Sequence, residues 1–377
     1  EEAVVDKMAD MLVAHGHEVV QYRKTTADTR ESFIGKVKGF VAGCYSPSGI
    51  YGLREVLQRE KPDVVNVHNL YPFISPVALF ECKKAKVPVV MTVHNFRLMC
   101  PTGLFLRNGK PCEECLKLGS EWGCIQHNCE HSILKSLGYA MRNRVARRIG
   151  AYHKCVDSFA CITDFQRKKL IEAGFDTDKI TVIPNSVEVL SGNTDIESEG
   201  CYVGFCGRLS REKGVDMIVE VARRHPEIPF KLAGKLRVGE DIGLLPPNCE
   251  LTGYLQADLL AAFYRNARFF VMASRWYEGF PMSILEAAQY GKCMVAPDHG
   301  GFTEIIGKGS YSIGCVFMPN DVDSLEQAVV VMWNNPQKTK ELGQRANEKL
   351  QREYSSDIVY SKWNKLLNKV VKNNSNG

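Results

Sequence analysis

The stretch Ser274-Arg-Trp-Tyr-Glu-Gly-Phe-Pro-Met-Ser-Ile-Leu-Glu286 decides how the second half of this 377-residue chain folds. It directly follows a continuous apolar run, 269–273, which predicts a buried strand. Pro281 suits the first turn of a helix, so the sequence predicts a helix over 281–291. Glu278 then lies at the carboxyl end of a strand, directly before the backbone N–H groups that open the helix. In open parallel sheets ligands bind at that edge, and a helix N-terminus favours anions.

Strand-like and helix-like runs alternate along both halves of the chain, which predicts an α/β fold with parallel sheets. The expected strands are 17–22, 63–67, 87–93, 158–162, 180–183, 202–206, 230–232, 269–273, 293–295 and 312–316. The polar segment 190–200 has no periodicity and is expected to link two Rossmann-like domains. We expect an amino-terminal domain at 1–187, a carboxy-terminal domain at 188–355, and a last helix, 356–377, that returns to the first domain.

The composition is that of an ordinary globular protein, with 45% hydrophobic and 24% charged residues. No apolar run reaches the ~18 residues that span a bilayer. Fourteen cysteines without a basic-then-apolar leader favour free thiols and a cytoplasmic location. Residues 1–185 carry 26 Lys and Arg against 20 Asp and Glu, which suits an anionic surface better than the second half does. We expect no nucleic-acid partner.

A second loop, Gly204-Phe-Cys-Gly-Arg-Leu-Ser-Arg-Glu-Lys-Gly214, follows the first expected strand of the second domain. Gly207 permits a tight backbone path, and Arg208 and Lys213 bring two cations to the carboxyl end of that strand. The loop matches neither the Walker A pattern nor the Gly-x-Gly-x-x-Gly fingerprint, which disfavours a nicotinamide dehydrogenase. A forked Arg and a point-charge Lys suit a diphosphate that is held without a metal ion.

Together these motifs resemble the donor half of glycosyltransferase family 4, of GT-B fold. The resemblance rests on GFCGRLSREKGVD from Gly204, on the Glu-x7-Glu pattern with Gly-Phe-Pro after its first Glu, and on GGFTEII from Gly300. It extends through PNSV, VHN and TVHN and covers nearly the whole chain. It implies two Rossmann-like domains facing a central cleft. The implied activity is a retaining glycosyltransferase that moves a sugar from a nucleotide-sugar, a UDP-sugar by preference, to a glycan or lipid-linked acceptor in cell-surface polysaccharide synthesis.

The resemblance also implies a role for each residue of the motifs. Arg208 and Lys213 would hold the donor diphosphate, and Glu286 would accept hydrogen bonds from the ribose hydroxyls. Glu278 and the backbone of 279–281 would contact the donor sugar, while the amides of 282–284 would face phosphate. The expected donor set is Gly207, Arg208, Lys213, Glu278, Gly279, Phe280, Pro281, Met282, Ser283, Ile284 and Glu286. The expected catalytic residues are His94, Arg208, Lys213 and Glu278, with no metal cofactor.

Two histidines end neighbouring expected strands, His94 after 87–93 and His68 after 63–67. A histidine at a strand end is as often a structural group as a functional one. The resemblance places His94 near the sugar or its acceptor. His68 and Asn95 are then expected on the acceptor side.

Five cysteines crowd a short segment of the first half: Cys100, Cys112, Cys115, Cys124 and Cys129. Cys112-Glu-Glu-Cys115 has the spacing of a zinc knuckle, and Cys124 with either Cys129 or Cys100 can complete a tetrahedral set. The alternative is a cysteine-rich loop without metal. A zinc ion here would hold a long loop together and would take no part in catalysis.

The expected helix 133–150 is amphipathic and basic. Its apolar side chains form one stripe, which consists of Leu134, Leu137, Met141, Val145 and Ile149. Such a helix can lie on an anionic membrane surface, which would make the protein a peripheral membrane protein. More often a helix of this kind packs its stripe into its own core. Both interpretations stay open.

Two other functions are compatible with the same motifs. One is a nucleotide-sugar epimerase of GT-B fold, and the other is a non-catalytic nucleotide-sugar-binding subunit. The family pattern also begins with a strand and a glycine-containing loop ahead of residue 1, so we expect roughly 15–20 further residues there in the natural chain.

Overall fold

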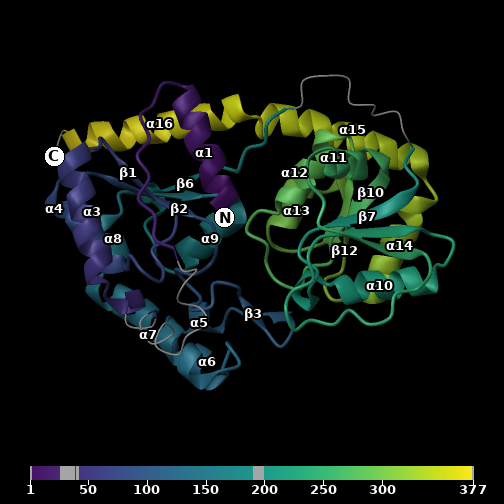
Figure 1. Cartoon of the computed structure of the whole chain (residues 1–377), viewed down its shortest axis with the longest axis horizontal. Helices are drawn as coiled ribbons and strands as arrows, with labels where there is room; N and C mark the ends of the chain where they lie inside the picture. Colours follow the sequence, from purple (N-terminus) through teal and green to yellow (C-terminus); the bar gives the residue numbers. More distant parts are fainter. Residues whose placement is uncertain (1, 26–38, 40–41, 190–198, 376–377) are drawn as a thin grey trace. The chain divides into compact units, whose positions relative to one another are not determined.

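The computed structural model describes residues 2–25, 39, 42–189 and 199–375. The chain forms two compact units, each built on a parallel sheet (Figure 1). Unit 1 comprises Glu1–Phe105, Cys112–Pro184 and Tyr360–Gly377, and unit 2 comprises Leu106–Pro111 and Asn185–Val359. Apart from 199–200, the expected linker lies outside the described residues. Within them, no helix is both long and apolar enough to cross a bilayer.

The sheet of unit 1 has four parallel strands in the order β1-β2-β5-β6. All five residues of β2 are buried, as expected for an apolar strand paired on both edges. The strands are β1 (Val65–Val67), β2 (Val89–Val93), β5 (Ser158–Cys161) and β6 (Ile180–Val182), and the principal helices are α1 (Glu2–Ala14), α3 (Pro47–Glu60), α4 (Leu79–Lys84), α8 (Ala151–Cys155) and α9 (Asp164–Glu172).

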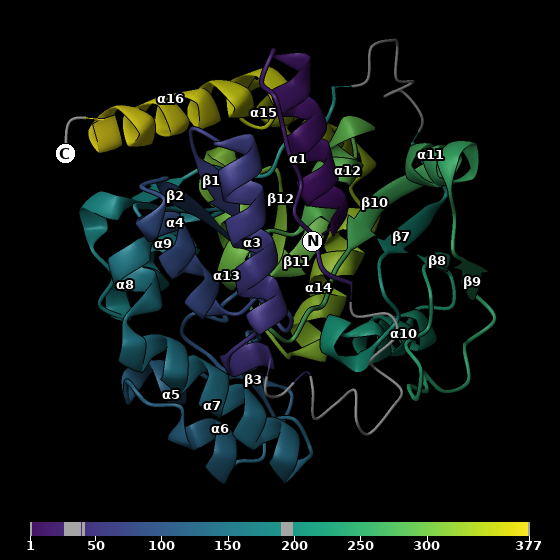
Figure 2. The ribbon, with the colours of Figure 1, turned by 60° about the vertical axis from the view of Figure 1, so that its left-hand side comes forward.

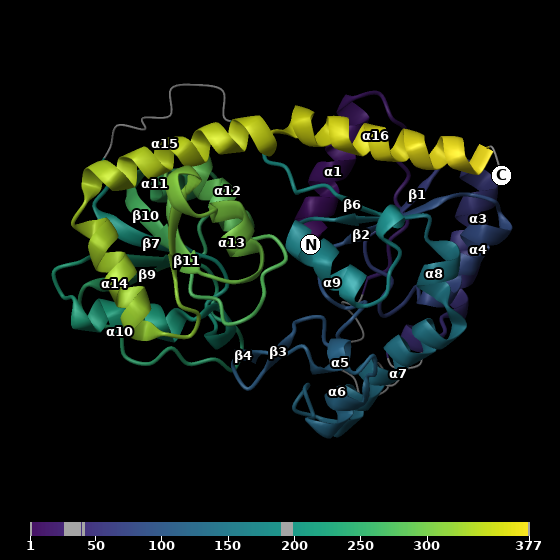
Figure 3. The ribbon, with the colours of Figure 1, turned by 180° about the vertical axis from the view of Figure 1, so that it is seen from behind.

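The strand predicted at 17–22 is wrong. No ladder joins this segment to another strand in the described part of the chain, and none of its residues is buried. Although its sequence alternates, the segment is therefore not part of a sheet. The last helix, α16 (Ser356–Ser375), lies beside α1 (Figure 3), where the Tyr360 ring stacks on His15 at 3.6 Å. Trp363 and Leu366 of α16 are buried.

Between β2 and β5 the chain carries an insertion of three helices. These are α5 (Glu114–Lys117), α6 (Trp122–Gln126) and the long α7 (Ile133–Ile149), which pack side by side in unit 1 (Figure 2). A two-stranded hairpin, β3 (Leu106–Arg107) with β4 (Lys110–Pro111), precedes these three helices in the chain and groups with unit 2.

The sheet of unit 2 has six parallel strands in the order β12-β11-β10-β7-β8-β9. Helices α11 and α12 cover one side of it, and α10 and α14 cover the other (Figure 1). The strands are β7 (Tyr202–Cys206), β8 (Phe230–Ala233), β9 (Cys249–Gly253), β10 (Ala267–Val271), β11 (Met294–Pro297) and β12 (Gly314–Phe317). The helices are α10 (Val215–Arg224), α11 (Ala257–Asn266), α12 (Met282–Gln289), α13 (Gly300–Ile306), α14 (Val322–Trp333) and α15 (Pro336–Glu353).

The strand order of unit 2 reverses beside β7, because β8 and β9 follow on one side and β10 to β12 on the other. In open α/β sheets ligands bind outside the carboxyl ends of the strands at such a reversal. The loops after β7 and β10 both start at this edge. They are the two loops that the sequence motifs single out.

Candidate active site

The loops after β7 and β10 are held in close contact by a glycine. Gly214 ends the first loop with φ of 69°, and a Cβ atom there would lie 2.0 Å from the carbonyl oxygen of Ala273. Only glycine allows both this left-handed backbone and this approach. The glycine therefore sets the spacing between Lys213, its neighbour in the chain, and the loop that carries Glu278.

An ion pair joins the same two loops. Lys213 Nζ donates to Glu278 Oε1 at 2.5 Å, and that oxygen also accepts from Ser274 Oγ at 2.9 Å and from Trp276 Nε1 at 2.6 Å. Burial raises the pKa of Glu278, but the Lys213 charge and these hydrogen bonds outweigh it and hold the pKa below its usual range. Among the described residues, Oε2 has no partner. A fixed carboxylate is therefore left with one oxygen for a ligand hydroxyl.

Arg208 lies on the same loop and is half exposed. Its Nη2 donates to Glu212 Oε1 at 3.0 Å, and Arg237 donates to the same oxygen at 2.7 Å. Two guanidinium groups thus share one carboxylate, which leaves an excess of positive charge at the sheet edge. Exposed ion pairs contribute only about 0–1 kcal/mol, so an anionic ligand can replace Glu212 as the partner of Arg208.

Helix α12 starts immediately after this loop. Pro281 is its N-cap and not its first residue, so the helix begins one residue later than predicted. The amide of Ile284 already donates to the Pro281 carbonyl at 3.1 Å. Within the described residues, the amides of Met282 and Ser283 have no acceptor. Of the three predicted anion-facing amides, these two are therefore available to a ligand.

Glu286 belongs to a separate network. Its Oε2 accepts from the Tyr264 hydroxyl at 2.8 Å, and the Tyr264 ring stacks on Tyr290 with centroids 5.4 Å apart. Burial raises the pKa of Tyr264, so its hydroxyl stays a donor at neutral pH. The two glutamates of the motif are thus each fixed, one by a lysine and the other by a tyrosine.

The segment after β11 contributes residues that the sequence analysis did not place in the site. The amide of Gly301 donates to the Glu278 carbonyl at 2.9 Å, and a Cβ atom on Gly301 would lie 2.7 Å from the Gly279 carbonyl oxygen. His299 Nε2 donates to the Ser274 carbonyl at 2.9 Å, while its Nδ1 is buried without a partner in the described chain. The signal in the sequence was His-Gly-Gly two residues after a strand.

In unit 1 the structure brings the two predicted histidines together. His68 Nδ1 and His94 Nε2 lie 2.8 Å apart at the ends of β1 and β2. Burial lowers the pKa of His68 to about 4 and, with the neighbouring His68, lowers that of His94 to about 3. Both rings are therefore neutral at neutral pH, and one donates to the other. Asn95 Oδ1 accepts from the Arg97 amide at 3.0 Å and so shapes the following turn.

Comparison with known proteins assigns these features to a family. Residues 2–189 match the family described as Glycosyltransferase Family 4, and residues 187–349 match Glycosyl transferases group 1. The chain belongs to this family of glycosyltransferases. Arg208, Lys213 and both glutamates fall within the second match, and both histidines fall within the first.

Among curated proteins, this glycosyltransferase is 27% identical over 284 residues to an uncharacterized 42.6 kDa protein in the cps region of Klebsiella pneumoniae, covering 74% of this chain and 68% of that protein. It is 24% identical over 249 residues to the alpha-galactosylglucosyldiacylglycerol synthase of Streptococcus pneumoniae, covering 60% and 64%. The chain thus spans less than two thirds of that synthase. Among solved structures, Anabaena HepE in complex with UDP has a TM-score of 0.63 at 17% identity, covering 85% and 82%. This similarity shows the GT-B fold.

The five cysteines of the insertion in this glycosyltransferase are all free thiols. A Cβ atom on Gly123 would lie 3.4 Å from Cys115 Sγ, and the amide of Cys129 donates to the Cys124 carbonyl at 3.2 Å, so these thiols are near neighbours. Cys124 Sγ donates to the Ser136 carbonyl at 3.8 Å. Among the described residues, no three His, Cys, Asp or Glu side chains stand in an arrangement that would hold a metal ion.

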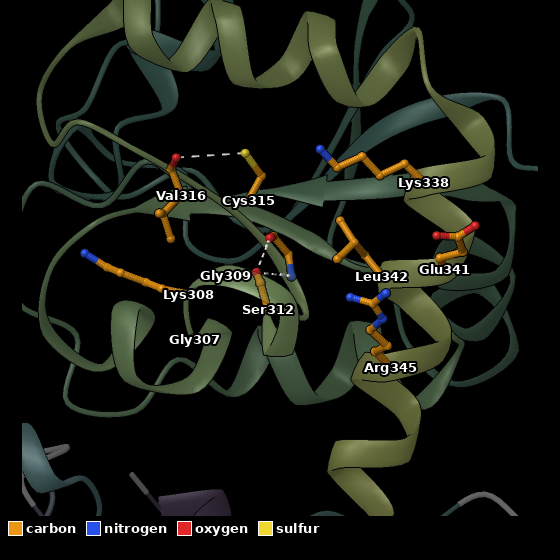
Figure 4. A pocket seen from close by; sticks show the side chains of 11 residues that line it. Gly307, Lys308, Gly309, Ser312, Cys315, Val316, Lys338, Glu341, Leu342 and Arg345 are labelled. Atoms are coloured by element: carbon orange, nitrogen blue, oxygen red, sulfur yellow. Dashed lines mark hydrogen bonds between the residues drawn. The ribbon is translucent and has the colours of Figure 1, made fainter.

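A cavity of about 630 Å³ in unit 2 lies at the amino end of β12 (Figure 4). Lys338, Glu341 and Arg345 of α15 form one wall, and the turn 307–312 faces them. The loops described above follow the carboxyl ends of the strands. None of the predicted site residues lines this cavity.

Proposed function

We propose that this glycosyltransferase moves a sugar from a UDP-sugar to a glycan or lipid-linked acceptor, with retention of anomeric configuration. The observation that carries the proposal is the Lys213–Glu278 pair beside Arg208, at the edge where the strand order reverses. A solved complex of HepE with UDP-glucose supports the choice of donor. The name of the Streptococcus pneumoniae synthase supports a lipid-linked acceptor. A cytoplasmic site of cell-surface polysaccharide synthesis belongs to the same proposal.

The chemistry needs positive charge where the leaving group forms. Cleavage of the glycosyl–phosphate bond puts negative charge on the departing diphosphate, and donors that are already in place stabilise it most. Arg208, Lys213 and the amides of Met282 and Ser283 supply such donors. Glu278 Oε2 accepts from a hydroxyl of the donor sugar. The neutral His94 contacts the sugar or the acceptor.

The test is to incubate the protein with UDP-glucose and related donors and to follow UDP release with and without added acceptors. Release of UDP that rises with an acceptor, together with a glycosylated product, supports transfer. A new nucleotide-sugar without any acceptor would instead identify an epimerase. Donor binding without any turnover would identify a binding subunit.

Glu286→Gln should act mainly on donor binding, because ribose hydroxyls do not change charge during transfer. Loss of a charged acceptor costs ~1.5–3 kcal/mol, so the Kd for UDP should rise roughly tenfold to a hundredfold. The turnover number at saturating donor should stay near the wild-type value. Calorimetric titration with UDP measures the first quantity. Glu341→Gln, an exposed change on α15, is the matched control and should leave the Kd unchanged.

We also propose that catalysis needs no metal ion, since Arg208 and Lys213 neutralise the diphosphate. A short incubation with EDTA should leave the rate unchanged. A rate that falls to zero at once and returns on addition of Mg²⁺ or Mn²⁺ would show that the cations do not replace a metal.

The structural zinc site remains a proposal for the cysteines of the insertion. Small side-chain rotations would be needed to turn thiols such as Cys124 from their oxygen acceptors toward a metal ion. Protein purified without added metal should contain about one zinc per chain, and Cys115→Ser should remove it. Cys201→Ser, an exposed cysteine of unit 2, is the control. A metal-free protein whose insertion resists proteolysis would rule the site out.

A further inference from the structure

Helix α7 turns its apolar stripe away from the core. Its buried residues are mostly small or polar: Ser136, Gly138, Ala140, Arg142, Asn143 and Ala146. Leu134 is 69% exposed, Leu137 37% and Met141 40%. The expectation that such a stripe packs into its own core is therefore wrong for these three residues. Exposed apolar side chains do not stabilise an isolated chain. The stripe therefore points to a binding partner that covers it.

The same exposed face of α7 carries basic side chains nearer the end of the helix. Leu134, Leu137, Met141, Arg144 and Arg148 are spaced three or four residues apart, which places all five on one side of the helix. Its first turns are apolar and its last turns are cationic. Across the 17 residues of α7 there are five Lys and Arg and no Asp or Glu.

The arginines of α7 fall into two groups. Arg142 is buried and donates to the Pro101 carbonyl at 2.9 Å, and Arg147 pairs with Glu121 at 2.6 Å. Both of these cations serve the fold of the insertion. Arg144 and Arg148 are exposed, and within the described residues they have no ion-pair partner. The arginines of α7 without a structural task are thus those that share a face with the apolar stripe.

The neighbouring helices add exposed apolar groups in the same insertion. Leu118 follows α5, and Trp122 begins α6, which packs against α7 (Figure 2). Both side chains are exposed. A tryptophan ring favours the boundary between lipid and water, where its ring is buried and its N–H stays hydrated.

We propose that this α7 face docks on the surface of an anionic lipid bilayer, with Leu134, Leu137 and Met141 among the acyl chains and Arg144 and Arg148 at the headgroups. An interfacial helix needs an apolar face flanked by cations and a location at the surface of its domain, and α7 has each of these. Cations near such a surface are attracted to acidic headgroups, and α7 itself carries no acidic side chain that these headgroups would repel. The proposal concerns a surface of unit 1 and does not depend on the donor chemistry.

The experiment is co-sedimentation of the full chain, without donor, with phosphatidylcholine vesicles and with vesicles that also contain phosphatidylglycerol. We expect binding to the anionic vesicles and little to the neutral ones. Arg144→Glu with Arg148→Glu should weaken binding at least about tenfold, and more salt should weaken the wild type as well. Leu134→Ser with Leu137→Ser should weaken it comparably.

Two double variants serve as matched controls in unit 2 and on α16. Lys340→Glu with Lys369→Glu makes the same change in net charge, and Val238→Ser with Leu244→Ser removes two other exposed apolar side chains. Both should bind vesicles as the wild type does, and a thermal shift with UDP checks that every variant is folded. The proposal is overturned if the wild-type protein does not bind anionic vesicles. It is also overturned if the control variants lose as much binding as the α7 variants. Self-association that only the Leu134 and Leu137 changes abolish, without vesicle binding, would assign the face to a second copy of the chain instead.

Discussion

Replacing Lys213 with alanine is expected to lower kcat by about a hundredfold or more at saturating donor. The ammonium group lies where charge grows on the leaving diphosphate, so its loss affects the transition state more than the bound donor. The loss also leaves Glu278 with only Ser274 and Trp276 as donors, which loosens the carboxylate that we assign to the sugar. The measurement is kcat and KM for UDP release in the presence of acceptor.

Arg211→Ala provides the matched control, because Arg211 is an exposed cation on the same loop. It should keep kcat within about a factor of two of the wild type. A double variant of Lys213 and Glu278 should lose less than the product of the two single losses, because the residues act as a pair. Wild-type kcat in Lys213→Ala would show that the lysine has no part in the chemistry.

Replacing Arg208 with alanine is expected to lower kcat by a similar factor, about a hundredfold. The guanidinium offers two parallel donors to phosphate oxygens, and lysine cannot reproduce that fork. Arg208→Lys should therefore recover only part of the lost rate. The same steady-state assay measures both variants.

Arg237→Ala separates two explanations for that loss. Arg237 shares Glu212 with Arg208, so its removal disturbs the same carboxylate without removing the proposed phosphate ligand. We expect Arg237→Ala to stay close to wild-type kcat. If both arginine variants lost activity equally, the Glu212 network and not a direct phosphate contact would explain the effect of Arg208.

Most of the fold could be predicted because buried parallel strands are continuous apolar runs. The run 202–206 gave β7 without error, and 269–273 gave β10 displaced by two residues. The strand prediction for 17–22 was wrong. An alternating pattern is compatible with a half-buried strand, but it does not show that a neighbouring strand is there to pair with it. β9 was missed because only its first residue, Cys249, is buried.

The candidate site was predicted where charged residues stand in the loops that follow buried strands. Arg208 and Lys213 lie in the loop after β7 and Glu278 lies in the loop after β10, and the structure brings Lys213 and Glu278 into contact. The contributions of Ser274 and Trp276 could not be predicted, because they depend on how the loop folds back on one oxygen. His299 was missed because the His-Gly-Gly that follows β11 marks a loop, while the carbonyl group to which His299 donates is fixed only by the fold.

The outward orientation of the apolar stripe on α7 could not be predicted from the sequence either. Periodicity locates an apolar stripe on a helix but does not say which way the helix is turned. Here Gly138 and Ala140 allow the helix to approach its unit with the small-residue face. The orientation follows from packing, which the sequence pattern alone does not contain.

The packing of α16 in unit 1 has a consequence for the order in which the two units fold on the ribosome. Unit 1 contains both the first described residues and Tyr360–Gly377, so it is made from segments that precede and follow unit 2 in the sequence. Domains usually fold in the order in which they are synthesised, amino-terminal part first. In this chain the α16 residues that pack on His15 and the surrounding apolar surface emerge after unit 2, because Tyr360, Trp363 and Leu366 follow all of unit 2 in the sequence. We expect a nascent chain stalled near residue 355 to carry a protease-resistant unit 2 and a protease-sensitive unit 1, so that unit 2 becomes native before unit 1.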